Sequence, residues 1–425
     1  MSRTPDSGGR GGTRVWPTMA SESTGSANQG TPSRRRVIAI VTPYFAPKIG
    51  GLETYALNIA KACLSRADLD VVVITSREKG RTRTTEIYEG LTVVRLPSWL
   101  RLSNSPLNPL WLWNVRQLFR HYGVDVVNTH SPVPFLADAA VLVAGARPVI
   151  MTYHAGSMRK GALPIDSVIG LYERVILPRL FRRATRIVSV SPGLLTGILA
   201  PWREKVELIT PGVDTDVFRP ATKTGDGVDE GGPIITFVGR LERSSQWKGI
   251  SVLLEAFHIL ATRDEWPGLQ LQLVGGGDGV SLYQEIAARL GIDGIVVFTG
   301  VLRGEDLVKA YQQSTVVVLP STTEAESFGI TLIEGMSCSK PVIGSRIGGI
   351  PFVISDGDDG LLVTPNDAES LASACALILS QPDLGVQLGA HGRRKVEERF
   401  SSRRLVERHV DLLRNAHLGP RQTVD

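Results

Sequence analysis

The fold is decided by the stretch at residues 234–261, which has the sequence IITFVGRLERSSQWKGISVLLEAFHILA. Residues 234–238 form an apolar run with the length and the β-branched content of a buried parallel strand. A loop with Gly239 and Gly249 follows, and residues 250–261 carry apolar side chains at helical spacing. The stretch therefore predicts a strand, a loop and a helix, which is the repeating unit of α/β proteins.

The same alternation extends in both directions from this stretch. Further strands are expected at residues 37–41, 71–75, 92–96, 124–128, 149–152, 186–189 and 206–209 before it, and at 269–274, 295–299, 316–319 and 342–343 after it. Helices are expected between many of them, for example at residues 52–64, 281–290 and 330–338. Alternating strands and helices predict parallel sheets with right-handed crossovers, and two such series predict two Rossmann-like domains.

A chain of 425 residues is too long for one hydrophobic core, so two domains are expected on length alone. The sequence divides into a disordered segment, a first domain, a linker, a second domain, and a C-terminal helix with a tail, at residues 1–33, 34–214, 215–232, 233–399 and 400–425. In open α/β sheets, ligands bind beyond the carboxyl ends of the strands. The loops that follow the strands, and a cleft between two facing sheets, are therefore the places where chemistry is expected.

The bulk composition indicates a globular protein of a reducing compartment. Hydrophobic residues make up 42% and charged residues 21% of the chain, and its three cysteines lack metal-ligand spacing. No apolar run is long enough to cross a bilayer, and residues 1–33 lack the apolar core of a signal peptide. We therefore expect a cytoplasmic protein.

Charge is distributed unequally between the two halves. Residues 34–214 carry 24 Lys and Arg against 13 Asp and Glu, a net charge of +11, whereas residues 215–425 carry 20 against 27, a net charge of −7. The first half therefore suits an anionic substrate or an anionic membrane surface. Nucleic acid is not expected, because no recognised nucleic-acid-binding motif accompanies the charge.

Two cations follow the strand at residues 234–238. Arg240 stands at the end of this strand, and Lys248 comes just before the helix that begins near Gly249. A diphosphate needs fixed positive charge, because it is anionic and gains charge when it departs as a leaving group. The planar fork of Arg and the compact ammonium of Lys together suit that task. Two solvated surface cations are the alternative interpretation.

Two carboxylates follow the fourth strand of the second series. Glu326 lies in the loop after this strand, and Glu334 lies on the helix that is expected to start near Gly329. Free N–H groups at that helix start, at Phe328, Gly329 and Ile330, offer a site for an anion such as phosphate. Carboxylates accept hydrogen bonds from vicinal hydroxyls, as ribose and hexose rings present. By spacing alone, two solvated acids explain the pair equally well.

These motifs occur in an order that resembles the family 4 retaining glycosyltransferases of the GT-B fold, among the glycosyl transferases group 1. The resemblance covers almost all of residues 35–410. It is carried by Gly239-Arg240-Leu241 with Lys248-Gly249, Glu326-Ser327-Phe328-Gly329 with Glu334, Gly50-Gly51 with Glu53, Ser191-Pro192-Gly193, Pro211-Gly212-Val213-Asp214, Gly275-Gly276-Gly277 and Gly348-Gly349-Ile350-Pro351. It implies two Rossmann-like domains with parallel sheets that face each other across a cleft. It also implies transfer of a sugar, with retention, from a nucleotide diphosphate sugar to a hydroxyl acceptor in glycan, glycolipid or cell-surface polysaccharide synthesis.

The resemblance further implies a role for each matching residue. Arg240 and Lys248 would bind the donor diphosphate, Glu326 and His154 would contact the donor sugar, and Glu334 would hold the ribose. Catalytic roles thus fall to Glu326, His154, Arg240 and Lys248. Glycines and the helix start complete the donor site, with backbone close to the phosphates at Gly50 and Gly51, a turn near the base at Gly275, and phosphate-facing backbone at Phe328, Gly329 and Ile330.

No cofactor and no metal ion are expected besides the donor substrate. The acidic clusters of the sequence lack the spacing of metal sites, and Arg240 with Lys248 would supply the positive charge. Two alternatives use the same residues, namely a sugar-nucleotide epimerase of the same fold and a non-catalytic nucleotide-sugar sensor.

On the acceptor side, the basic first domain is expected to bind an anionic or lipid-linked acceptor, or the anionic inner face of a membrane as a peripheral protein. Arginines lie among apolar residues at positions 174–186, and large aromatic residues occupy positions 99, 111, 113 and 119. The same apolar residues would also fit the core of the domain. Arg159 and Lys160 offer a different site, for a phosphate on a small soluble acceptor.

Overall fold

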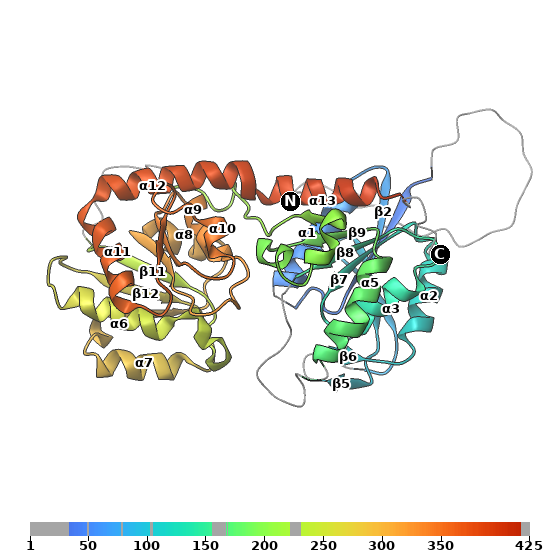
Figure 1. Cartoon of the computed structure of the whole chain (residues 1–425), viewed down its shortest axis with the longest axis horizontal. Coiled ribbons are helices and arrows are strands. Elements are labelled where there is room, and N and C mark those ends of the chain that lie inside the picture. The colour runs from blue at the N-terminus through green and yellow to red at the C-terminus, as the bar shows by residue number, and fades with distance from the viewer. Residues whose placement is uncertain are drawn as a thin grey trace, which may run out of the picture. The chain divides into compact units, whose positions relative to one another are not determined.

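The computed structural model describes residues 34–48, 51–77, 80–102, 105–154, 167, 169–221 and 231–417 (Figure 1). The segment 1–33, Gly50, Arg159 and Lys160 lie outside the described residues. The chain folds into two compact units. One contains the residues up to Thr152, Val175–Arg186 and the chain end from Val410, and the other contains Tyr153–Arg174 and Ile187–His409.

The first sheet has eight strands in the order β10-β9-β8-β7-β1-β2-β4-β3. The strands are β1 (Arg36–Thr42), β2 (Leu69–Ser76), β3 (Thr84–Tyr88), β4 (Leu91–Leu96), β7 (Val126–Ser131), β8 (Val149–Tyr153), β9 (Arg186–Ser189) and β10 (Val206–Leu208). β1 pairs in parallel with β2 and β7, and β3 is antiparallel to β4. The central strands consist mainly of buried Val and Ile, whose branched side chains favour extended backbone.

A short hairpin and several helices accompany this sheet. The hairpin consists of β5 (Leu100–Leu102) and β6 (Ser105–Leu107). The helices are α1 (Gly51–Leu64), α2 (Trp111–His121), α3 (Leu136–Val143), the π-helical turn η1 (Tyr172–Ile176), α5 (Leu177–Arg183) and the 3₁₀ turns η2 (Pro192–Leu195) and η3 (Ala200–Lys205). The four α-helices of this group each bury apolar side chains, for example Ala56, Ile59 and Cys63 of α1.

The second sheet has six parallel strands in the order β13-β12-β11-β14-β15-β16. They are β11 (Ile234–Val238), β12 (Gln270–Val274), β13 (Val296–Gly300), β14 (Val316–Leu319), β15 (Val342–Ser345) and β16 (Leu361–Val363). The strand order reverses between β11 and β14. In open parallel sheets such a reversal leaves a crevice at the carboxyl ends of the two strands, where ligands bind.

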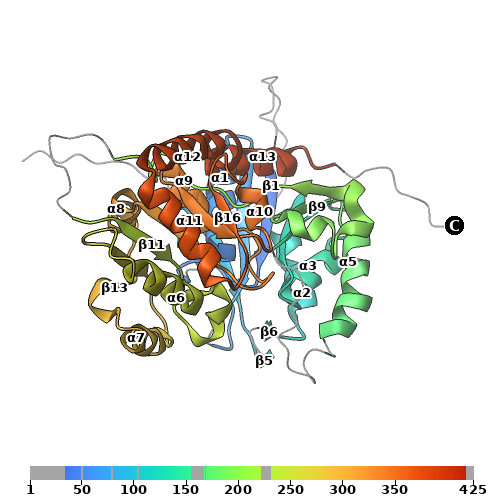
Figure 2. The same ribbon diagram turned by 60° about the vertical axis from the view of Figure 1, so that its left-hand side comes forward.

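Helices cover both faces of the second sheet. They are η4 (Arg243–Lys248), α6 (Ile250–Ala261), α7 (Val280–Arg289), η5 (Asp293–Ile295), α8 (Gly304–Gln313), α9 (Ile330–Ser337), α10 (Ile350–Val353), α11 (Ala368–Ser380), α12 (Pro382–Lys395) and η6 (Val396–Phe400). The last helix is α13 (Ser402–Arg414), whose residues from Val410 belong to the first unit. Figures 1 and 2 show α6 and α7 on one face of this sheet and α8 and α9 on the other. The two layers enclose an apolar core that includes Phe237, Phe257 and Leu332.

The expected elements largely match the observed ones. The strands at 186–189, 234–238 and 316–319 and the helix at 250–261 have the expected bounds, and the C-terminal helix expected within residues 400–425 is α13. The strand expected at 124–128 begins and ends later, as β7. The sequence did not predict β3, β5, β6 or β16, which are short or, in the case of β3, largely exposed.

Candidate active site

The loop that follows β11 is fixed by backbone hydrogen bonds to the loop that follows β12. Gly239 N–H donates to Val274 O (2.9 Å), and Leu241 N–H donates to Gly276 O (3.0 Å). Gly275, with φ +148°, lies so close to this loop that a Cβ on it would stand 1.8 Å from Gly239 O. Only glycine tolerates both the φ angle and the approach, so Gly275 shapes the backbone that carries Arg240.

Arg240 projects from this loop with 68% of its side chain exposed. Its Nη1 lies 3.7 Å from Glu242 Oε2, and the Glu242 side chain is itself 36% exposed. Exposed pairs at this separation contribute little stability. The Arg240 guanidinium is therefore available to an anion at the carboxyl end of β11.

Lys248 is held beside the loop that follows β14, the strand next to β11. Thr322 N–H donates to Trp247 O (2.7 Å), which joins the end of η4 to the loop after β14. The Lys248 ammonium lies 3.0 Å from Glu326 Oε2 and 4.6 Å from the centre of the Trp247 ring. The Lys248 and Glu326 side chains are only 14% and 10% exposed, so this ion pair is largely removed from water.

The Glu326 loop is clamped by the loop that follows β15. Gly349 N–H donates to Glu326 O (2.8 Å), and a Cβ on Gly349 would stand 2.1 Å from Ser327 O. Ser321 Oγ lies 3.4 Å from the same Glu326 carboxylate oxygen that faces Lys248. Ser191 Oγ donates to Ser327 O (2.6 Å). The carboxylate and the peptide groups of this loop are therefore fixed from several sides.

Glu334 lies one turn into α9, and the expected helix start is confirmed because α9 begins at Ile330 with Gly329 as its N-cap. The Tyr311 hydroxyl, from α8, donates to Glu334 Oε2 at 2.6 Å. Burial raises the pKa of Glu334 to about 7, although the hydrogen bond from Tyr311 favours the ionised form. The same burial, together with the Glu334 charge, raises the pKa of the Tyr311 hydroxyl well above its usual value. Glu334 is thus poised between its neutral and ionised forms.

The remaining residues singled out in the sequence have varied surroundings. His154 follows β8 close to His409, and burial lowers its pKa to about 3, so its imidazole is neutral at physiological pH. Gly51 is the first residue of α1, with open space where a Cβ would stand. Phe328 is 2% exposed and packs edge-to-face on Phe400, so its side chain belongs to the core and only its backbone is placed to meet a ligand.

Ile330, the first residue of α9, is 37% exposed. The structure thus joins Lys248 to Glu326, and separately gives Glu334 the partner Tyr311. Tyr311 and Ser321 had no signal in the sequence, because their role follows from contacts with elements that are distant along the chain. Within the described residues no group of three or more His, Cys, Asp or Glu side chains is arranged to hold a metal ion.

Comparison with known proteins relates both halves of the chain to sugar-transferring enzymes. The family model described as Glycosyltransferase Family 4 matches residues 49–217, and the one described as Glycosyl transferases group 1 matches residues 219–395. D-inositol 3-phosphate glycosyltransferase of Saccharomonospora viridis is 36% identical over 315 residues, which are 71% of this chain and 67% of that protein. O-antigen chain mannosyltransferase C of Escherichia coli is 27% identical over 385 residues, which are 89% and 97% of the two chains.

Among solved structures, sucrose-phosphate synthase from Thermosynechococcus elongatus matches with a TM-score of 0.71 at 25% identity, over 89% of this chain and 98% of that one. The expected fold of two parallel-sheet α/β domains is confirmed, and the epimerase and sensor alternatives are not favoured. The chain belongs to glycosyltransferase family 4, with the GT-B fold, and is an enzyme that transfers a sugar.

Proposed function

We propose that the enzyme takes its sugar from a nucleotide diphosphate sugar and transfers it, with retention and without a metal ion, to a hydroxyl of an anionic acceptor. The observation that carries this proposal is the buried Lys248–Glu326 pair beside the exposed Arg240, at the strand reversal between β11 and β14. In open parallel sheets, ligands bind at such a reversal, beyond the carboxyl ends of the strands. Two cations from one loop region and a carboxylate from the neighbouring loop suit a diphosphate joined to a sugar.

Within this proposal the chain acts chiefly by positioning and charge. As the bond between the anomeric carbon and the diphosphate oxygen lengthens, negative charge grows on the diphosphate, and Arg240 and Lys248 stabilise it. Glu326 holds the Lys248 ammonium in place and accepts hydrogen bonds from the sugar hydroxyls. The departing phosphate oxygen takes the proton of the acceptor hydroxyl, and the new bond forms on the face that the diphosphate leaves, which gives retention.

The proposed acceptor follows from charge and from one relative. Residues 34–214 have a net charge of +11, and the 36% identical relative is named for inositol 3-phosphate, an anionic acceptor. The same positive charge would attract an anionic lipid surface. The exposed side chains of Trp99 and Trp113 lie in this part of the chain. No described helix has both the length and the apolar character that crossing a bilayer requires. From this charge and these exposed aromatic side chains, we propose a peripheral contact with anionic membranes through the first unit.

The test is a transfer assay with a panel of nucleotide sugars and with inositol phosphates as acceptors, in EDTA and in Mg²⁺. We expect transfer in both conditions, and an anomeric proton coupling in the product that matches the donor. Inversion of that coupling, or activity that depends on added metal, would overturn the respective part of the proposal. Arg240→Ala should weaken nucleoside diphosphate binding by about 1.5 to 3 kcal/mol, the scale of a charge-assisted hydrogen bond, and an unchanged affinity would remove Arg240 from the site.

A further inference from the structure

The Glu334 carboxylate has one occupied oxygen and one open oxygen. Its Oε2 accepts the hydrogen bond of 2.6 Å from the Tyr311 hydroxyl. Within the residues that the structure describes, Oε1 accepts no hydrogen bond, and no Lys, Arg or His side chain pairs with the carboxylate. A partly buried carboxylate with a single donor is costly to ionise, so a second donor would stabilise its charged form. Tyr311 therefore fixes one side of a group whose other side can still bind.

Tyr311 is itself held by packing. It lies in the last turn of α8, and its side chain is fully buried. Its ring meets the ring of Phe218 edge-to-face, with 5.8 Å between the two ring centres. Aromatic pairs favour this spacing and orientation. The ring contact therefore restricts where the Tyr311 hydroxyl can lie.

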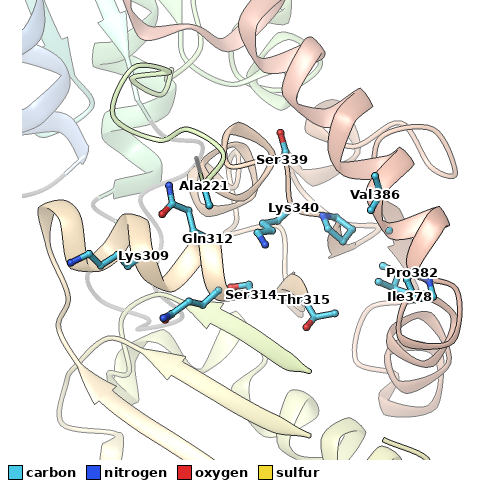
Figure 3. A pocket seen from close by; sticks show the side chains of 13 residues that line it. Ala221, Lys309, Gln312, Ser314, Thr315, Ser339, Lys340, Ile378, Pro382 and Val386 are labelled. Atoms are coloured by element: carbon cyan, nitrogen blue, oxygen red, sulfur yellow. The ribbon is translucent and has the colours of Figure 1, made fainter. Parts of the chain in front are cut away.

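Phe218 belongs to the segment that the sequence predicts as a linker, and the backbone of this segment is tied to helices of the second unit. The Phe218 carbonyl accepts from a serine hydroxyl at the end of α9 (2.6 Å) and from Arg393 Nη1 of α12 (2.8 Å). The carbonyl of Arg219 accepts from Gln312 Nε2 of α8 (2.8 Å). Figure 3 shows Gln312 beside Ala221, where the segment passes the end of α8. The start of the expected linker is therefore held in place against α8.

We propose that Tyr311 is a positioning residue of the donor site, which acts through Glu334, and that Phe218 holds the Tyr311 ring in place. The Tyr311 hydroxyl holds one carboxylate oxygen and leaves the other to accept from the ribose of a nucleotide. It also favours the ionised form of Glu334, which is the form that accepts from two hydroxyls. The proposal rests on the proposed function, in which Glu334 binds that ribose. Neither Tyr311 nor Phe218 needs to touch the donor.

The ionisation of Glu334 can be measured without any ligand. The whole protein is labelled with carbon-13 in its Glu carboxyl groups, and the NMR signal of Glu334 is assigned by its absence in Glu334→Gln. Burial raises the pKa values of Tyr311 and of the neighbouring Cys338 thiol, so both groups stay uncharged while Glu334 titrates. Tyr311→Phe removes the hydroxyl and keeps the ring. Because one hydrogen bond to a charged group is lost, we expect the acid ionisation constant of Glu334 to fall about tenfold.

Tyr283→Phe is the matched control for this titration. Tyr283 is a buried tyrosine of the same unit, and its hydroxyl has no hydrogen-bond partner among the described residues. This change removes the same atom from a similar environment, so the titration of Glu334 should stay as in the wild type. A shift as large as that of Tyr311→Phe would show a general effect of lost packing and would overturn the proposal.

Calorimetry with UDP, GDP and ADP connects the titration to donor binding. At pH 7 the ionised fraction of Glu334 should fall from about one half to about one tenth in Tyr311→Phe, so the Kd of the nucleotide that binds should rise about fivefold. At pH 9 the carboxyl is ionised in both proteins, and the ratio of their Kd values should approach one. A tyrosine that only supports the fold would raise Kd equally at both pH values, and that result would overturn the proposal.

Phe218→Leu tests the contact with the linker segment. It should shift the Glu334 titration in the same direction as Tyr311→Phe, and should add little to it in the double variant, because both changes act through one hydroxyl. Additive shifts would remove Phe218 from the proposal, and an unchanged titration in Tyr311→Phe would overturn it altogether. If none of the three nucleotides binds to the wild type, the proposed function fails, whereas the carboxyl titration still decides whether Tyr311 controls Glu334.

Discussion

The Lys248 ammonium and the Glu326 carboxylate compensate each other in an environment with little water. Their separation of 3.0 Å and their low exposure mean that neither group can lose its partner without a substantial cost. Such a pair adds little stability in itself, since desolvation offsets much of the attraction. The pair instead orients the Lys248 and Glu326 side chains, because both are already at fixed positions before a substrate binds.

The first prediction concerns Glu326→Gln. The amide has the same volume and can still accept a hydrogen bond from Lys248, so the fold should persist, but the proposed charged contact to the sugar would be lost. We expect the turnover rate to fall by at least about 100-fold, the scale seen when one fixed electrostatic contact to a transition state is removed. Initial rates and a thermal unfolding curve measure the two effects. Wild-type turnover in this variant would show that Glu326 does not contact the reacting sugar.

Glu334 provides a second prediction, through its pKa of about 7. In the proposed donor site, vicinal ribose hydroxyls would donate to the ionised carboxylate, so nucleoside diphosphate affinity should rise with pH up to about 7 and then level off. The corresponding 2′-deoxy nucleotide has the same phosphate ionisation but lacks one donor, and is the matched control. Calorimetric Kd values from pH 5.5 to 8.5 measure the difference. A pH dependence that is the same for both nucleotides, or that persists in Glu334→Gln, would contradict the ribose role.

The same pKa shift has a consequence for stability. The pKa of Glu334 is higher in the folded protein than its usual value of 4.5, so the folded state binds this proton more tightly than the unfolded state does. Its contribution to the free energy of unfolding is present below about pH 4.5 and is lost as the pH rises through about 7. The free energy of unfolding of Glu334→Gln, relative to that of the wild type, should therefore be higher at pH 8 than at pH 5. Chemical denaturation of both proteins at the two pH values measures this difference. An equal stability difference between variant and wild type at both pH values would show that Glu334 has an ordinary pKa.

The sequence placed the four principal candidate residues in loops and on a helix, but it did not predict their partners. Arg240, Lys248, Glu326 and Glu334 each stand in a motif with a post-strand context. Tyr311 has no such context, since it meets Glu334 through packing of α8 near α9, and 23 residues separate the two. Similarly, the Lys248–Glu326 contact spans 78 residues and depends on the adjacency of β11 and β14. Local pattern carries no information about such pairings.

The strands and helices of the second sheet were predictable because each has its own strong signal. β11, β14 and α6 are buried apolar segments of ordinary length, flanked by glycine or polar residues. β3 has the sequence TTEIY and is mostly exposed, so it lacks the burial pattern from which a strand can be predicted. Its extended structure depends on pairing with β4. Edge elements owe their structure to their neighbours rather than to their own composition.

The loops between these elements support a further prediction, on Gly349→Ala. An added Cβ would stand 2.1 Å from Ser327 O, and relieving that clash must move the loop that holds Glu326. We expect a loss of about 1 to 3 kcal/mol in unfolding free energy, the usual cost of overpacking, together with a large loss of turnover. Gly294→Ala is the matched control, because nothing lies within 4 Å of its added Cβ. A Gly349→Ala variant with wild-type turnover would show that the clamp on Glu326 is unimportant.

Taken as a whole molecule, the chain has its excess of positive charge in the half that also exposes large apolar side chains. Not all of the apolar residues noted in the sequence are at the surface, since Trp111, Phe119, Leu177, Leu180 and Phe181 are buried in the core. Trp99 and Trp113 are 53% and 61% exposed, with Leu100 and Leu112 beside them in sequence. Trp111 Nε1 donates to Pro97 O (3.0 Å), which ties the segment of Trp99 to the start of α2. We call Trp99, Leu100, Leu112 and Trp113 the aromatic edge.

The last prediction is that the aromatic edge binds anionic membranes. Trp113, Arg116 and Arg120 share one face of α2 by helical spacing, and all three are exposed. Each basic residue contributes about 1 kcal/mol near an anionic surface, so changing Arg116 and Arg120 to Ser should weaken vesicle binding about thirtyfold. Changing Trp99 and Trp113 to Ser should weaken the vesicle binding that remains at high salt, where salt screens the charged contacts.

The control for this prediction is the double change Val297→Ser and Val301→Ser, at exposed apolar residues of the other unit. Flotation with vesicles of increasing anionic lipid content, at low and high salt, measures binding. If the wild type does not float even at low salt, the aromatic edge has no role at a membrane. The positive charge of the first unit would then attract a soluble anionic acceptor.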